Sequence, residues 1–371
     1  MGKIKSMIKK IIYKLPQKYI VFESYPELSD NTKAVYDEML KRNLNSKYKF
    51  VWLTRGGNGN YPALKNVIYA DQNSLKLKIY LARAKAIIFC NGILEPRHSG
   101  QFSIFLQHGT GIKETHNYYK VPESINYGLA ASDWATEMLM KEHDLPKEKI
   151  ISLGYPRNDI LTAEPLDLHK YFKNEFKKII VWYPTFRQHK GGLKTGAANA
   201  LPIIWDENKA VELNEYAKEN SVLLVLKPHF AQDLTKIKNL NLSNIVFIDD
   251  AFFKDNDITS YRFVGSCDAL LTDYSSIYFD FTLCDKPIGL IWEDYEEYKQ
   301  NPGFAVDMDY FMKGGVKIYN LEDFKAFIRD IAEGVDKLKD ERREIRDIAN
   351  YSTDGKNAER VADFIIEKAK L

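Results

Sequence analysis

Short apolar runs alternate with helical stretches along this chain, and this alternation restricts the fold more than any other feature of the sequence. In the first half, the runs that read as strands are 19–24, 50–54, 66–70, 86–90, 102–107 and 149–154. Helical stretches near 31–42, 74–84 and 132–143 lie between or after them. The rhythm returns in the runs 179–184, 222–227, 244–249, 269–273 and 287–292. Strands that alternate with helices predict an α/β fold with parallel sheets.

The length of the chain indicates more than one domain, because 371 residues exceed a typical domain and suffice for two with ample cores. We expect two Rossmann-like domains that face a cleft in a GT-B-like arrangement, the first over 19–160 and the second over 177–350. A polar segment near 161–176 reads as the linker. The final segment, 351–371, reads as a helix that can cross back to the first domain.

Three strand ends carry polar residues that suit chemistry. His108 ends one apolar run, His229 follows another, and Asp273 ends a third, just before Ser275 and Ser276. Open α/β sheets bind ligands at the carboxyl ends of their strands, and a helix start that offers hydroxyls and N–H groups suits a phosphate. Each signal also has an ordinary interpretation, since a histidine after a strand is often a turn residue and Asp-Tyr-Ser-Ser is often an N-cap. Their matching positions in three βα units favour a shared site.

Charge and cysteine content exclude several classes of protein. The 53 basic and 51 acidic residues leave a formal charge of +2, which does not indicate a nucleic-acid-binding surface. Cys90, Cys267 and Cys284 lie within or beside apolar runs, without CxxC or zinc spacing, and read as reduced, buried thiols. Asp307 and Asp309 form a DxD by spacing, but the pair follows a Pro-Gly-Phe turn rather than a strand end. We therefore expect neither a metal site nor a cofactor.

The first 18 residues carry a basic amphipathic pattern. Apolar residues recur at helical spacing, and most of the six lysines lie off that stripe. This pattern predicts a helix over 1–18 that lies on an anionic membrane surface; the alternative is that the stripe packs on the core. No run approaches the roughly 18 apolar residues that span a bilayer, and no signal peptide follows the first lysines. The sequence thus predicts a peripheral protein on the cytoplasmic face of a membrane.

Five short motifs occur in an order that resembles one enzyme family. They are HGTGIKE at 108–114, GYPRND at 154–159, YPTFR at 183–187, KPH at 227–229 and TDYSSIYFDF at 272–281. Together with FESYPELSDNTKAVYDEM at 22–39, they resemble the CDP-glycerol glycerophosphotransferases, bacterial enzymes of teichoic acid and related polymer synthesis. Two neighbourhoods depart from the family pattern: Gly111 and Ile112 stand where Pro-Leu is usual, and Pro228 and Phe230 flank a histidine usually found in KLHP.

The resemblance implies transfer of glycerol phosphate or ribitol phosphate from a CDP-alditol to an undecaprenyl-diphosphate-linked saccharide, with release of CMP. His108, in an acceptor-binding first domain, is the expected general base, and His229, in a donor-binding second domain, is expected to stabilise the leaving group. The expected donor-binding residues are Arg187, Lys227, Thr272, Asp273, Ser275 and Ser276. The residues expected to line the cleft are Gly109, Thr110, Arg157 and Asn158, with a structural role for the last two equally weighted.

Two other functions fit the expected fold. A sugar-nucleotide glycosyltransferase or epimerase would have the same two domains, and a non-catalytic nucleotide-binding protein at the membrane would keep the fold without turnover. The ordered histidine-bearing motifs favour the transferase. A glycine- and lysine-rich stretch, 187–202, reads as a mobile lid or as an irregular surface loop. The choice of glycerol or ribitol donor, the acceptor and the number of units added stay open.

Overall fold

The computed structural model describes residues 15–56, 61–114, 120–185, 201–228, 234–300 and 303–371. The predictions for the helix over 1–18 and for the loop 187–202 therefore lie largely outside the described residues, and those for Arg187 and His229 lie wholly outside them. The chain divides into two units: unit 1 is Met1–Thr110, His116–Asp159 and Tyr351–Leu371, and unit 2 is Gly111–Thr115 and Ile160–Asn350. Each unit contains one parallel sheet, which confirms the predicted α/β class.

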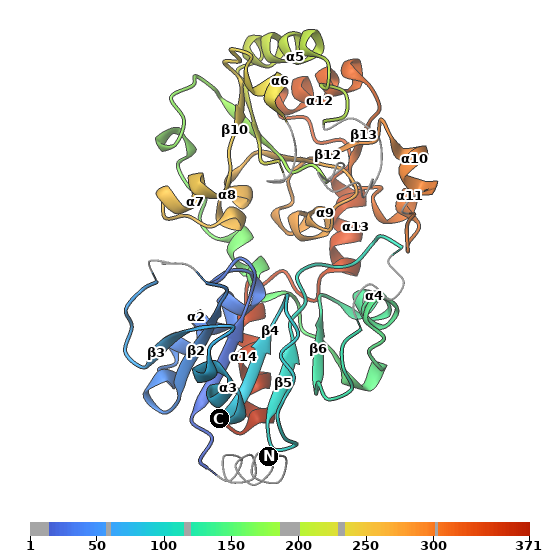
Figure 1. The fold of residues 1–371 in the computed structure, drawn as a ribbon. Helices are drawn as coiled ribbons and strands as arrows, with labels where there is room; N and C mark the ends of the chain where they lie inside the picture. Colours follow the sequence, from blue (N-terminus) through green and yellow to red (C-terminus); the bar gives the residue numbers. More distant parts are fainter. Residues whose placement is uncertain (1–14, 57–60, 115–119, 186–200, 229–233, 301–302) are drawn as a thin grey trace. The chain divides into compact units, whose positions relative to one another are not determined.

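Unit 1 is built on a seven-stranded sheet in which every neighbouring pair is parallel. In spatial order the strands are β3 (Val67–Asp71), β2 (Lys49–Thr54), β1 (Tyr19–Glu23), β4 (Ala84–Phe89), β5 (Phe102–Phe105), β6 (Tyr127–Ala130) and β7 (Ile150–Ser152). Figure 1 shows β3, β2, β4, β5 and β6 following one another across this unit. The strand order reverses between β1 and β4, and such a switch point is where open α/β sheets bind ligands.

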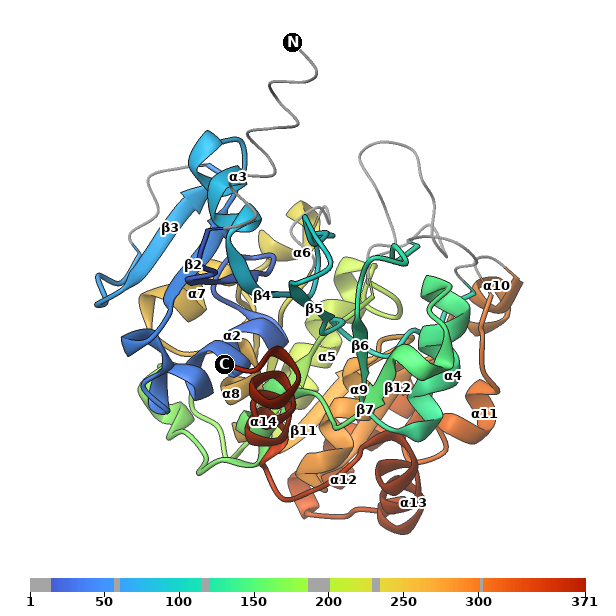
Figure 2. The same ribbon diagram turned by 90° about the horizontal axis from the view of Figure 1, so that it is seen from below.

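Unit 1 has four described helices, two of which begin at a capping serine. They are α2 (Asp30–Lys41), α3 (Leu75–Ala82), α4 (Asp133–His143) and α14 (Asn357–Ala369), with short 3-10 turns η1 (Leu44–Ser46) and η2 (Lys147–Lys149). Ser74 and Ser132 cap α3 and α4 by accepting a main-chain N–H three residues on. From the far end of the chain, α14 packs against α2 (Figure 2). Arg42 forms an ion pair with Asp363 of α14.

The core of unit 1 combines apolar strand residues from both faces of the sheet with apolar residues of the helices that cover it, as expected for a parallel sheet. Four of its large buried aromatic side chains come from β1, α2 and β2. Phe22 contacts both Tyr36 and Phe50 with ring centroids 5.2 Å apart, and it stacks on Trp52 at 5.5 Å. These rings fix α2 on β1 and β2, and α2 begins beside the candidate site described below.

Unit 2 is built on a six-stranded parallel sheet. In spatial order the strands are β10 (Ile245–Phe247), β9 (Val222–Leu226), β8 (Lys178–Trp182), β11 (Ala269–Thr272), β12 (Ile288–Ile291) and β13 (Val316–Ile318). The strand order reverses between β8 and β11. All five residues of β9 are buried, so this run of branched aliphatic residues has no solvent face.

The helices of unit 2 are α5 (Glu207–Glu219), α6 (Thr235–Lys238), α7 (Asp250–Asp255), α8 (Ser260–Ser266), α9 (Ile277–Phe281), α10 (Tyr295–Gln300), α11 (Met308–Phe311), α12 (Leu321–Glu333) and α13 (Lys339–Ala349). The 3-10 turns are η3 (Pro156–Thr162), which begins in unit 1, η4 (Leu168–Lys170) and η5 (Thr282–Cys284). The segment read as a linker packs within unit 2: Phe172 stacks on Phe252 at 5.6 Å, and a Cβ on Gly265 would lie 2.3 Å from the Leu161 carbonyl oxygen.

Among the described residues, no helix has both the length and the apolar content needed to cross a bilayer. In the same ranges, no group of three or more histidine, cysteine, aspartate or glutamate side chains is arranged to hold a metal ion. The two aspartates of the DxD have separate partners, because Asp307 caps α11 at the N–H of Tyr310 and Asp309 forms an ion pair with Lys317.

Candidate active site

His108 lies three residues beyond the end of β5, at the carboxyl edge of the unit 1 sheet. The main chain leaves the sheet through Gln107, whose φ of 55° is in the left-handed region that non-glycine residues seldom adopt. Gln107 is buried, whereas the side chain of His108 is exposed. The turn therefore presents the imidazole of His108 at the sheet edge where parallel α/β sheets bind ligands.

The surroundings of His108 favour its neutral form. Although His108 is exposed at the surface, the chain packed around the turn removes part of the hydration of its imidazole and so lowers its pKa below the ordinary value. The nearby carboxylate of Asp30 opposes this shift, and the guanidinium of Arg157 adds to it. A neutral imidazole can accept a proton, so the direction of this shift suits a general base near neutral pH.

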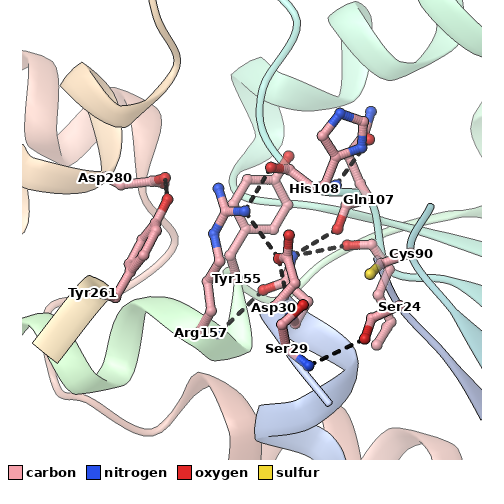
Figure 3. A network of polar contacts seen from close by, with 12 residues as sticks. Ser24, Ser29, Asp30, Cys90, Gln107, His108, Tyr155, Arg157, Tyr261 and Asp280 are labelled. Atoms are coloured by element: carbon pink, nitrogen blue, oxygen red, sulfur yellow. Dashed lines mark hydrogen bonds and ion pairs between the residues drawn. The ribbon is translucent and has the colours of Figure 1, made fainter. Parts of the chain in front are cut away.

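Arg157, predicted to line a cleft, is tied to the main chain of His108. Its Nη1 donates to the carbonyl oxygen of His108 at 2.5 Å and to Oδ1 of Asp30 at 2.9 Å (Figure 3). Its side chain is 10% exposed, and its guanidinium lies over the ring of Tyr155, 5.6 Å from the centroid. In the described contacts Arg157 therefore holds the turn that carries His108.

The rest of the GYPRND motif anchors the last helix. Asp159 accepts hydrogen bonds from the N–H groups of Asn357 and Ala358 at 2.9 and 2.7 Å, at the start of α14. Gly154 has a φ of 81°, and a Cβ there would lie 2.2 Å from Oδ1 of Asn357. Asn158 is 1% exposed. This motif therefore sets the position of α14 within unit 1, as well as holding His108 through Arg157.

Two of the predicted cleft residues follow His108 directly. Gly109 is half-buried, and Thr110 is buried with its hydroxyl 3.4 Å from that of Tyr155. The next residues belong to unit 2, where Lys113 forms an antiparallel bridge with Phe304 and the Ala305 N–H donates to the Ile112 carbonyl at 2.9 Å. The HGTGIKE motif is thus divided between the two units.

Behind the turn, Gln107 connects the main chain of His108 to two titratable residues of α4, half-buried Glu142 and buried His143. Its Oε1 accepts the main-chain N–H of His108 at 2.9 Å, and its Nε2 lies 2.8 Å from Nε2 of His143 and 3.4 Å from Oε2 of Glu142. Since Nε2 of Gln107 is a donor, Nε2 of His143 must accept. Burial raises the pKa of Glu142 to about 7. Local sequence patterns do not indicate this pair, because its members lie 35 and 36 residues further along the chain.

In unit 2, Thr272 and Asp273 hold the loop that follows β8. The hydroxyl of Thr272 donates to the carbonyl of Tyr183 at 2.9 Å. The two carboxylate oxygens of Asp273 each lie 2.9 Å from the N–H of Thr185, whose hydroxyl also donates to the carboxylate. Both residues are at most 1% exposed. Thr272 and Asp273 therefore fix the YPT segment that leads to Arg187.

Ser275 and Ser276 follow Asp273 after one intervening residue, and both are half-buried. Ser276 occupies the N-cap position of α9, but its side chain makes no capping hydrogen bond. Its hydroxyl is therefore not used in the manner of an ordinary N-cap. Because α9 has only five residues, the two hydroxyls and the adjacent main chain matter more here than a helix dipole.

Lys227 follows β9, immediately before Pro228. Its N–H donates to the carbonyl of Trp182 at 2.9 Å, and its ammonium lies 3.0 Å from a carboxylate oxygen of Asp250. The same ammonium lies 5.9 Å from the centre of the Tyr183 ring. The carboxyl edge of the unit 2 sheet thus brings three predicted donor-binding residues together. Lys227 contacts the last residue of β8, and Thr272 and Asp273 contact the loop after it.

A family model describes proteins of the CDP-glycerol:poly(glycerophosphate) glycerophosphotransferase type, and it matches residues 6–367. The chain belongs to this family. The motif set at 108–114, 154–159, 183–187, 227–229 and 272–281 falls within the matched range. Both candidate site regions, at His108 in unit 1 and at Asp273 in unit 2, are therefore part of a glycerophosphotransferase family chain.

Two relatives match this glycerophosphotransferase family chain over most of their length. The teichoic acid poly(glycerol phosphate) polymerase of Bacillus spizizenii is 28% identical over 340 residues, which cover 83% of this chain and 82% of that protein. The teichoic acid glycerol-phosphate transferase of Staphylococcus aureus is 25% identical over 403 residues, which cover 96% and 95%. A solved structure of the wall teichoic acid polymerase TagF has a TM-score of 0.75 at 20% identity, covering 98% of this chain and 92% of that chain, and shows the same fold.

Proposed function

We propose that this protein transfers glycerol phosphate or ribitol phosphate from a CDP-alditol to a hydroxyl of a lipid-linked acceptor and releases CMP. The observation that carries the proposal is the family membership of the chain over residues 6–367. The exposed imidazole of His108, at the carboxyl edge of a parallel sheet, supplies a group that the reaction needs.

His108 acts as the general base in this proposal. The acceptor hydroxyl oxygen forms a bond to the phosphorus that carries the alditol, and the bond from that phosphorus to the bridging oxygen breaks. CMP leaves with the electron pair, and the hydroxyl proton passes to the imidazole. The lowered pKa of His108 keeps the ring neutral before the step, which is the form that can accept this proton.

Unit 2 holds the CDP end of the donor in this proposal. The hydroxyls of Ser275 and Ser276 and the ammonium of Lys227 would bind the diphosphate, while buried Thr272 and Asp273 position the loop after β8. His229 would stabilise the charge on the departing CMP, and Arg187 would bind a phosphate with its two-pronged guanidinium. The roles of these last two rest on the sequence motifs alone.

The acceptor in this proposal is an undecaprenyl-diphosphate-linked saccharide at the cytoplasmic face of a membrane. Its support is the basic amphipathic pattern of residues 1–18. Deletion of residues 1–17 is expected to abolish sedimentation with anionic vesicles, while turnover on a water-soluble acceptor analogue is retained. A truncated chain that still sediments at high salt would place the membrane contact elsewhere.

The function is tested with a panel of donors. The protein is incubated with radiolabelled CDP-glycerol, CDP-ribitol or UDP-sugars together with an undecaprenyl-linked disaccharide, and the lipid product is sized. We expect CMP release and lipid labelling with one or both CDP-alditols. UDP release instead would identify a sugar-nucleotide enzyme, and donor binding without any release would identify a non-catalytic nucleotide-binding protein.

A further inference from the structure

Asn31, the second residue of α2, is fully buried, and its side chain makes hydrogen bonds to main-chain groups of two distant segments. Its Nδ2 donates to the carbonyl oxygen of Leu106 at 3.2 Å and to that of Gln107 at 2.7 Å. Its Oδ1 accepts the main-chain N–H of Arg157 at 3.1 Å. One amide group therefore joins the start of α2, the end of β5 and the GYPRND motif.

Arg157 extends this arrangement to the next residue, because its Nη1 donates to the carbonyl oxygen of His108. The same Nη1 pairs with Asp30, which also accepts the main-chain N–H of Asn31 at 2.7 Å. Figure 3 shows Arg157 between Asp30 and the His108 segment. The carbonyl groups of three consecutive residues, 106 to 108, are thus each held by a side chain, and we call this set of contacts the carbonyl clamp.

The carbonyl clamp acts where the sheet no longer fixes the main chain. β5 ends at Phe105, and Gln107 adopts a left-handed φ that costs roughly 1 kcal/mol or more for a non-glycine residue. Such a conformation persists only when its surroundings hold it. Since the Cα–Cβ direction of His108 follows from this main chain, the clamp sets the direction in which the histidine side chain leaves the main chain.

We infer that Asn31 is a positioning residue for His108, which orients the base through the main chain without touching substrate. The existence of the clamp is independent of the reaction, whereas its value for turnover rests on the proposed function. The clamp requires that the side chain of residue 31 donate hydrogen bonds to two carbonyl oxygens. Aspartate has the size of asparagine, but its carboxylate has no N–H to donate and would face two carbonyl oxygens. The isosteric Asn31→Asp change should therefore fail to replace asparagine.

The first test needs no substrate. Hydrogen–deuterium exchange is measured on peptides that cover residues 103–111 in Asn31→Ala, Asn31→Asp and a matched control, Asn214→Ala. Asn214 is also a buried asparagine that accepts a main-chain N–H, from Asn244 at 2.8 Å, but it lies on α5 in unit 2. We expect exchange in 103–111 to accelerate about tenfold or more in both Asn31 variants and to be unchanged in the control. Wild-type exchange in the Asn31 variants would overturn the clamp.

The second test measures turnover with CDP-glycerol. We expect kcat to fall about 10- to 100-fold in both Asn31 variants, as for a displaced catalytic group, with donor Kd within about threefold of wild type. Wild-type kcat in Asn31→Asp would show that the residue only fills space, and would overturn the inference. If wild-type protein turns over no CDP-alditol, the proposed function fails while the exchange result still decides the clamp. If the Asn31 variants do not fold, Arg157→Lys is measured instead, with the same expected and contrary results.

Discussion

Removal of the Asp273 carboxylate should loosen the loop after β8 and weaken donor binding. In the native chain, two donors of Thr185, its N–H and its hydroxyl, end on this carboxylate at a site that is 1% exposed. Each buried donor left without an acceptor costs about 1–3 kcal/mol, so Asp273→Ala should destabilise unit 2 by about 2–6 kcal/mol. Asp273→Asn keeps one acceptor oxygen, and the hydroxyl of Thr185 can rotate to accept from the new amide, so about 1–2 kcal/mol is expected.

The Tm of each variant is measured by differential scanning calorimetry, and its affinity for CDP is measured by isothermal titration calorimetry. A domain of this size loses about 2–4 °C in Tm per kcal/mol, so Asp273→Ala should lower Tm by at least about 4 °C, and more than Asp273→Asn does. The matched control is Asp268→Ala, because Asp268 accepts the N–H of Ile179 at 2.9 Å at the opposite end of β8. The control should lose stability but keep CDP affinity. A Tm for Asp273→Ala within about 2 °C of wild type, or unchanged CDP affinity, would refute this reasoning.

Three further outcomes are expected. Because the pKa of His108 is lowered and the base must be neutral, kcat/KM should fall only as pH drops below the ordinary histidine range; an acid limb above pH 7 would contradict this. The pKa of Glu142 is raised to about 7 in the folded chain, so the folded state loses stability as the pH rises from the pKa of the unfolded glutamate toward 7. Glu142→Gln should therefore be more stable than wild type at pH 8 by up to about 3 kcal/mol. Equal or lower stability of the variant in denaturant melts would contradict this. Burial raises the thiol pKa of Cys90, Cys267 and Cys284, so all three should resist alkylation at pH 8 until the chain is unfolded, as measured by mass spectrometry.

The strands that sequence reasoning located best are those with long apolar runs. Two described strands were not predicted: β6 (Tyr127–Ala130), which contains a glycine, and β13 (Val316–Ile318), which contains a lysine. Short strands at or near a sheet edge bury fewer residues, so their apolar pattern is weak. The class of fold followed from the sequence because the most apolar runs, such as 222–226, are fully buried in a parallel sheet.

Sequence reasoning indicated candidate site regions but not the contacts that their side chains make. The motif containing Asp273 suggested a phosphate site, yet in the structure the carboxylate faces Thr185, 88 residues earlier in the chain. Asn31 lay in a segment already noted for its family resemblance, and its function as a clamp depends on Gln107 and Arg157, which are 76 and 126 residues away. Local spacing carries no information about such pairings, because they are set by the tertiary fold.

The most direct measurement of the central claim is the rate of CMP release from CDP-glycerol or CDP-ribitol by wild-type protein and by His108→Ala, with a lipid-linked acceptor present. We expect release by wild type and a loss of about 10²- to 10⁴-fold in the variant, with donor affinity within a few-fold of wild type, because a base contributes to the chemical step rather than to nucleotide binding. A variant that releases CMP at the wild-type rate would remove His108 from the mechanism, and a wild-type protein that releases no CMP from either donor would contradict the proposed reaction.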